Sequence, residues 1–131
     1  MAEWLEENGL AAGSLSFENG AGLSRTVRIS AREFGKLLDF GWRQPYMPEF
    51  VASLSLSGLD GTLRRRFRNT PIVGHAHLKT GSLDDVAAIA GYLQSRSGRH
   101  YSVVVLHNEK DVHRGTGEEV QEAVLRWLYE R

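Results

Sequence analysis

One apolar run constrains the fold of this chain more than any other stretch. Residues 86–93 are apolar at successive positions, so both faces of a strand formed there would be buried and each would need a covering layer. Residues 101–107 are rich in β-branched side chains and predict a second strand, while residues 72–79 predict a third. The connections are short, with a turn at residues 95–98, so we expect a three-stranded antiparallel meander.

The covering layers are predicted to be helices. Ser30 and Glu33 have the spacing of a capping box, and the apolar residues that follow fall on one helical face. Thr116 and Glu119 repeat this pattern near the end of the chain. We expect the last helix to bury a stripe formed by Val120, Val124, Trp127 and Leu128.

Two shorter helices are expected at residues 2–8 and 49–56, so the first half of the chain is mainly helical. The fold class is therefore α+β, of the α/β-sandwich type, in a single domain. Residues 1–70 form its helical half, and residues 71–131 form the sheet with the C-terminal helix.

Composition excludes some classes of function. The formal net charge is zero, whereas a general binder of nucleic acid or anionic membranes would carry a clear basic excess. The chain has no cysteine, which rules out a disulfide framework or a thiolate site. No apolar run approaches the roughly 20 residues that cross a bilayer, and we expect no signal peptide at Met1.

The segment at residues 75–83 carries the clearest candidate site. Lys79 can attract a carboxylate as a compact point charge, and Thr80 can donate a hydrogen bond to the same group. Gly81 has no side chain, so a ligand can lie close to the main chain there. These residues suit a strand edge that binds an anionic, peptide-like substrate by strand addition.

Four stretches, in order, carry a resemblance to a known family. They are Glu-Asn-Gly-Ala-Gly-Leu-Ser-Arg at 18–25, Gly-Leu-Asp-Gly-Thr-Leu at 58–63, Leu-Lys-Thr-Gly-Ser-Leu at 78–83 and Ala-Gly-Tyr at 90–92. Together they resemble the C-terminal part of the low-molecular-mass class C penicillin-binding proteins, which are serine D-Ala-D-Ala carboxypeptidases and endopeptidases of peptidoglycan. The first loop departs from the family pattern at Glu18, Asn19 and Ala21, and Val27 stands where the family tends to have Asn.

The resemblance implies a penicillin-binding/β-lactamase-like transpeptidase fold and assigns roles to four residues. Lys79 and Thr80 would hold the terminal carboxylate of a D-Ala-D-Ala stem peptide or of a β-lactam, and Gly81 would keep the approach clear. The backbone N–H of Ser82 would supply half of an oxyanion hole. No cofactor is implied, and the parent protein would be periplasmic or otherwise extracytoplasmic.

The family's nucleophile has no counterpart in this chain. It is the Ser of a Ser-x-x-Lys motif, but Glu33, Ala76 and His107 stand three positions before the three lysines. The Ser-x-Asn element is also absent. We therefore expect a C-terminal fragment without hydrolytic activity or covalent labelling by penicillin. Loss of N-terminal strands would leave a sheet edge unpaired, which predicts weak self-association.

Two alternatives have weaker support. His75 and His77 are two residues apart, so on a strand both can face one Zn²⁺ ion, with His100, His107 and His113 as further ligands. No His-Glu-x-x-His motif accompanies them. The arginines at 64–66 and 68 suggest a phosphate patch, but a solvated or salt-bridged face explains so short a cluster better. A non-catalytic interaction module is the other open alternative.

Overall fold

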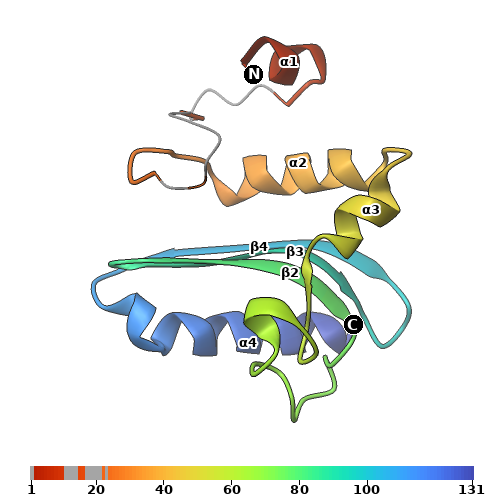
Figure 1. Ribbon diagram of the computed structural model, residues 1–131, viewed down its shortest axis with the longest axis vertical. Coiled ribbons are helices and arrows are strands. Elements are labelled where there is room, and N and C mark those ends of the chain that lie inside the picture. The colour runs from red at the N-terminus through yellow and green to blue at the C-terminus, as the bar shows by residue number, and fades with distance from the viewer. Residues whose placement is uncertain (1, 11–14, 17–21, 23) are drawn as a thin grey trace.

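The computed structural model describes residues 2–10, 15–16, 22 and 24–131. The helices are α1 (Ala2–Glu7), α2 (Ala31–Trp42), α3 (Met47–Ala52) and α4 (Thr116–Tyr129), with 3₁₀ turns η1 (Gly61–Leu63) and η2 (Val112–Arg114). The strands are β1 (Ser55–Leu56), β2 (Ala76–Leu83), β3 (Val86–Gln94) and β4 (His100–Asn108). Figure 1 shows α2 on one face of the sheet and α4 on the other. The α+β class is confirmed. The first of the four stretches quoted for the resemblance, residues 18–25, contains an expected turn at 18–22. That turn lies outside the described residues, apart from Gly22.

The sheet has four strands in the order β1-β2-β3-β4, and every neighbouring pair is antiparallel. The predicted meander is confirmed, but three strands was the wrong number. Residues 55 and 56 were assigned to a helix, whereas α3 begins earlier, at Met47, and ends at Ala52. The chain then pairs Ser55 with Leu78 and Leu56 with His77, so the first half contributes a short strand to the sheet.

The candidate segment lies well inside β2 because this strand starts later than predicted. Buried Ser57 donates its hydroxyl to the Ile72 carbonyl at 2.6 Å, and the Gly74 N–H donates to the Ser57 carbonyl at 2.9 Å. These bonds hold residues 72–75 in turns, and the strand begins only at Ala76. Residues 79–82 therefore lie within a strand, whereas the sequence predicts a strand that ends at residue 79.

β3 is buried on both faces, as its apolar run predicted. Ile89 and Leu93 join the core beneath α4, together with Leu125. On the opposite face, Tyr92 packs with Leu38 of α2. The Tyr92 hydroxyl donates to the Leu38 carbonyl at 2.6 Å, and burial, with a smaller contribution from Asp39, raises the pKa of this phenol to about 12.

The two predicted capping boxes have different outcomes. At α2, the Glu33 N–H donates to the Ser30 hydroxyl, and the Glu33 carboxylate accepts from the Ser30 N–H. At α4, Thr116 is already the first helical residue, because Gly115 with φ +130° occupies the cap position. The Gly115 carbonyl accepts from the Glu118 and Glu119 N–H groups, so the prediction of a second capping box is wrong.

The buried face of α4 also differs from the prediction. Trp127, expected in the core, is 57% exposed, and the Arg131 guanidinium lies over its ring at 4.3 Å. The helix instead buries Gly117, Gln121, Leu125 and Tyr129. Gly117 lies close against β3, since a Cβ there would overlap Ala87.

Candidate functional site

The outer edge of β2 borders a groove of about 610 Å³. Lys79, Thr80, Gly81 and Ser82 all line this groove, and Arg25 from the segment before α2 lines it as well. The four candidate residues from the sequence thus lie together along one groove. It is open enough to admit an extended peptide, the kind of ligand that binds at a strand edge.

The backbone of β2 points every second residue's N–H and C=O toward this edge. The Ser57 N–H donates to the Ala76 carbonyl at 2.8 Å, so Ala76 faces the β1 side. Backbone groups alternate along a strand, and Thr80 and Ser82 therefore face the same way. β1 pairs with β2 no further along than Leu78. In the described part of the chain, the N–H groups of Thr80 and Ser82 meet no partner strand on this side.

The Lys79 side chain turns over the same edge. Its ammonium donates to the Thr80 carbonyl at 2.6 Å and forms no salt bridge with any described residue. An ammonium has three N–H donors, so two remain for an incoming group. Lys79 thus presents a positive charge to the groove without a fixed carboxylate partner among the residues described.

The Thr80 hydroxyl is bonded within the protein. Thr80 Oγ1 donates to Thr62 Oγ1 at 3.0 Å, although the two residues are 18 positions apart. Thr62 belongs to η1, within the turn at residues 58–63. The second stretch quoted for the family resemblance therefore lies directly beside the Lys-Thr-Gly segment.

Packing inside the sheet does not require glycine at position 81. A Cβ added there would lie 3.5 Å from the Cβ of Ala88, which is an ordinary van der Waals contact, and Gly81 has no positive φ. Gly91 is different. A Cβ at Gly91 would overlap the His77 carbonyl oxygen and lie 2.9 Å from the Leu78 Cα, so this glycine lets β3 approach β2 closely. Gly91 shapes the sheet, whereas Gly81 leaves the groove open.

Sequence reasoning gave no role to Thr62 and Arg25, although both lie in the stretches that carry the resemblance. Arg25 forms a salt bridge with Asp84 at 3.6 Å, and both side chains are largely exposed. Arg25 therefore adds a second cation to the groove. Its position in the loop quoted for the resemblance was the only available signal, since nothing local links residue 25 to residue 79.

The five histidines are dispersed. The His75 ring lies against Tyr129 and the His100 ring against Trp42, both in tilted geometry. His77 is half-buried, and His113 Nδ1 accepts from the Asp85 N–H at 3.0 Å. His107 contacts Glu109 at 3.1 Å. Among the described residues, no group of three or more His, Cys, Asp or Glu side chains could hold a metal ion.

The arginine cluster is a solvated and salt-bridged face, as the simpler explanation predicted. Arg64, Arg65 and Arg68 are exposed. Arg66 packs against α4, where its guanidinium pairs with the carboxylates of Glu118 and Glu122 at 3.8 and 3.5 Å.

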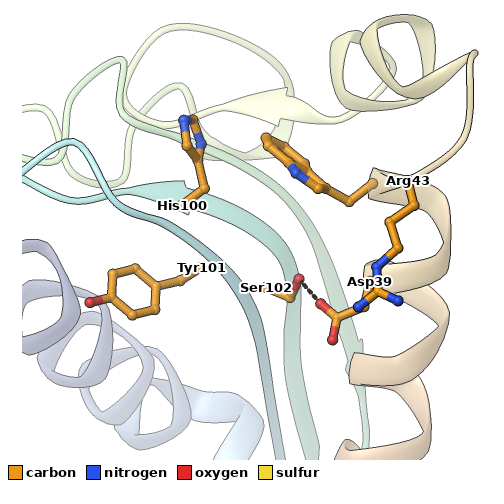
Figure 2. Close-up of a pocket in the computed structure, with 6 residues that line it drawn as sticks. Asp39, Arg43, His100, Tyr101 and Ser102 are labelled. Carbon is orange, nitrogen blue, oxygen red and sulfur yellow. Dashed lines mark hydrogen bonds between the residues drawn. The ribbon is translucent and has the colours of Figure 1, made fainter.

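A second, smaller cavity of about 190 Å³ lies between α2 and β4, away from the β2 edge (Figure 2). Ser102 and Asp39, which line it, form a hydrogen bond of 2.5 Å, while Tyr101 points from the same strand toward α4. The ring centroids of His100 and the nearby Trp42 are 4.9 Å apart in a tilted arrangement. This cavity contains none of the four residues proposed from the Lys-Thr-Gly-Ser segment; of the histidines considered as zinc ligands, it contains His100. Its Ser102–Asp39 bond ties α2 to the edge strand.

Residues 1–131 match the D-Ala-D-Ala carboxypeptidase 3 (S13) family. A D-alanyl-D-alanine carboxypeptidase from Actinomadura sp. (strain R39) is 32% identical over 101 residues, which make up 73% of this chain and 19% of that protein.

Two solved structures of penicillin binding protein 4 from Haemophilus influenzae share the fold. One has a TM-score of 0.86 at 22% identity and covers 98% of this chain and 30% of that one. The other, complexed with a novel β-lactam, has a TM-score of 0.77 at 24% identity and covers 84% of this chain and 26% of that one. The chain thus spans less than a third of each of these three relatives.

Proposed function

The chain belongs to the D-Ala-D-Ala carboxypeptidase 3 (S13) family, and we propose that it forms the C-terminal part of the catalytic domain of a serine-type D-Ala-D-Ala carboxypeptidase or endopeptidase. Residues 1–70 would form its mainly helical half, which also contains β1, and residues 71–131 its sheet half with the C-terminal helix. The substrate is a peptidoglycan stem peptide ending in D-Ala-D-Ala. The alignment of Lys79, Thr80, Gly81 and Ser82 along one open groove is the observation that supports this function.

Each of the four residues has a distinct role in this proposal. Lys79 and Thr80 bind the terminal carboxylate of the stem peptide, or that of a β-lactam, through a charge-assisted and a neutral hydrogen bond. Gly81 keeps the edge clear of side-chain atoms. The N–H of Ser82 donates to the oxyanion that forms when the scissile carbonyl is attacked. The alternation of backbone groups along β2 supports this last role.

The chemistry itself requires residues that this chain does not contain. Acyl transfer needs an activated nucleophile, and the sequence has no Ser-x-x-Lys motif to supply one. We infer that the chain alone does not hydrolyse stem peptides and does not react covalently with penicillin. The site of action would be extracytoplasmic, where peptidoglycan lies. In the described part of the chain, no helix is long and apolar enough to cross a membrane.

Carboxylate recognition can be tested on the chain itself. N-acetyl-D-Ala-D-Ala is titrated into ¹⁵N-labelled protein, and its C-terminal carboxamide is titrated in parallel. The acid should bind and shift the amide resonances of residues 79–82, whereas the carboxamide should bind more weakly. Lys79→Gln should weaken binding of the acid by about tenfold or more, because hydrogen bonds to charged groups contribute about 1.5–3 kcal/mol. Lys36→Gln, an exposed lysine on α2, is the matched control.

Two results would contradict the proposal. Equal affinity for the acid and the carboxamide would show that the groove does not recognise a carboxylate. A fluorescent penicillin that stays attached to the chain through denaturing electrophoresis would show that a nucleophile is present after all.

A second proposal concerns self-association, and the β4 edge supports it. Residues 100–108 contain no Lys, Arg, Asp or Glu, and within the described residues only β3 pairs with this strand. Long uncharged edges recruit other strands. Two copies paired antiparallel about Val104 would oppose no like charges.

Helix α4 carries an exposed apolar stripe that could extend the same interface. Glu118 and Glu122 meet Arg66 on the β2 side of the helix. At 100° per residue, Val120 and Trp127 lie on the other flank of the helix, away from Arg66, and they are 41% and 57% exposed. A second copy would cover this stripe together with the strand edge.

Sedimentation velocity tests this interface. The chain should form dimers at high concentration, and Trp127→Glu should abolish them without unfolding the protein, because the side chain is exposed. Leu59→Glu is the control, since Leu59 is 54% exposed in the turn that follows β1, beyond the opposite edge of the sheet. A wild-type chain that stays monomeric, or a dimer that survives Trp127→Glu, would refute the interface.

A further inference from the structure

The turn at residues 58–63 has no role in the proposed chemistry, yet it delivers one side chain to the site. Thr62 Oγ1 lies 3.0 Å from Thr80 Oγ1. Both residues line a cavity of about 150 Å³ behind the β2 edge, and Thr80 also lines the larger groove in front of it. The Thr80 hydroxyl thus stands at the boundary between the two spaces, with Thr62 behind it.

Thr62 is held at this place by a tightly fixed turn. The Asp60 carboxylate accepts from the Leu56 N–H at 2.6 Å, which anchors the turn to β1. Gly61 has φ +50°, and a Cβ there would overlap the Ser55 hydroxyl. Leu63, which follows Thr62, is fully buried. With both flanking residues fixed, the position of Thr62 relative to β2 is fixed as well.

Hydroxyl chemistry gives this contact a consequence. A hydroxyl has one O–H donor, and in the free protein Thr80 directs it at Thr62. To donate to a carboxylate in the groove, Thr80 must turn that hydrogen forward. Its oxygen then becomes free to accept, and Thr62 has a hydroxyl hydrogen to donate to it.

We propose that Thr62 is a positioning residue for carboxylate recognition, which acts through a two-hydroxyl relay. In the bound state Thr62 donates to Thr80, and Thr80 donates to the carboxylate. Linked hydrogen bonds polarise one another, so Thr80 becomes a stronger donor than an isolated threonine. The bond also holds the Thr80 side chain in one rotamer before the ligand arrives. This inference rests on the proposed function, because it requires that a carboxylate binds in the groove.

A purely structural role for Thr62 predicts something different. If the Thr62–Thr80 bond only tied η1 to β2, its loss would lower stability and affect every ligand of the groove alike. The relay is specific for anionic ligands, because a stronger donor favours a carboxylate over a neutral amide. The ratio of affinities for acid and carboxamide therefore separates the two roles.

The experiment titrates N-acetyl-D-Ala-D-Ala and its carboxamide into wild-type protein and three variants, followed by the amide resonances of residues 79–82. Thr62→Val keeps the shape of the side chain but removes the hydroxyl. It should weaken binding of the acid about two- to tenfold, the effect of one hydrogen bond, and leave carboxamide binding unchanged. Thr62→Ser keeps the hydroxyl and should bind the acid as the wild type does. Thr116→Val, an exposed threonine at the start of α4, is the matched control.

The outcomes are distinguishable. If the wild type shows no preference for the acid, the proposed function itself fails. If the wild type prefers the acid and Thr62→Val retains the full preference, the relay is refuted while the function stands. A loss of affinity for both ligands, or a failure of Thr62→Ser to restore binding, would assign Thr62 a structural role and overturn the relay. Urea unfolding of each variant confirms that the compared proteins are folded.

Discussion

Gly91→Ala should destabilise the protein more than any other single methyl group added to the sheet. The new Cβ would overlap the His77 carbonyl oxygen and lie 2.9 Å from the Leu78 Cα, and neither backbone atom can rotate away. Overpacking of this kind costs about 1–3 kcal/mol. The φ of +149° at this position adds about 1–3 kcal/mol for a residue with a side chain. We therefore expect a loss of about 4 kcal/mol in the free energy of unfolding.

Equilibrium unfolding in urea, followed by tryptophan fluorescence and circular dichroism, measures this loss. Gly81→Ala is the matched control on the neighbouring strand. Its Cβ would make only a 3.5 Å contact with Ala88, so its free energy of unfolding should stay within about 0.5 kcal/mol of the wild type. The same variant should weaken binding of N-acetyl-D-Ala-D-Ala, because the added methyl group narrows the groove. A loss below about 1 kcal/mol for Gly91→Ala would show that β2 and β3 can separate locally to relieve the contact, and it would refute this reasoning.

Two further predictions concern buried polar groups. Ser57→Ala should lower the free energy of unfolding by about 2–4 kcal/mol, because the Ser57 hydroxyl satisfies two buried backbone groups at the start of β2; Ser53→Ala, at an exposed position, should have little effect in the same urea titration. Tyr92 should make stability depend on alkaline pH. Its folded pKa of about 12 lies above the ordinary value of 10.0, so its contribution is fully present below pH 10 and is lost as pH rises toward 12; Tyr92→Phe should remove this part of the pH dependence, and an unchanged profile in the variant would contradict the assignment.

Local patterns in the sequence predicted the features that depend on neighbouring residues. The apolar run at residues 86–93 indicated a strand buried on both faces, and Ser30 with Glu33 indicated the start of α2. Each signal is contained within one element, so little else can override it. The grouping of Lys79, Thr80, Gly81 and Ser82 follows for the same reason, because consecutive residues of a strand stay together wherever that strand lies.

Features that depend on distant contacts were not predictable from local pattern. Thr116 and Glu119 have the same spacing as Ser30 and Glu33, but Gly115, with a positive φ, occupies the cap position, and the helix starts one residue earlier than the pattern predicted, at Thr116. Trp127 belongs to an apolar stripe whose Leu128 packs against the core, yet Trp127 and Val120 are exposed and the helix buries Gly117, Gln121, Leu125 and Tyr129. Strand β1 consists of only two residues, and its pairing with β2 is a contact between positions more than twenty residues apart.

The three other stretches quoted for the family resemblance acquire separate tasks around β2. The Ala-Gly-Tyr stretch allows β3 to pair closely with β2, through Gly91. The turn at 58–63 brings Thr62 to the hydroxyl of Thr80. The described end of the first loop brings Arg25 to the groove. Lys-Thr-Gly on its own is a short motif that any exposed strand can carry. Under the proposed function, the motif gains specificity because separate segments of the chain fix the position of the strand, the partner of the Thr80 hydroxyl and the Arg25–Asp84 ion pair beside the groove. A change in any one of them should then alter carboxylate recognition in a different and measurable way.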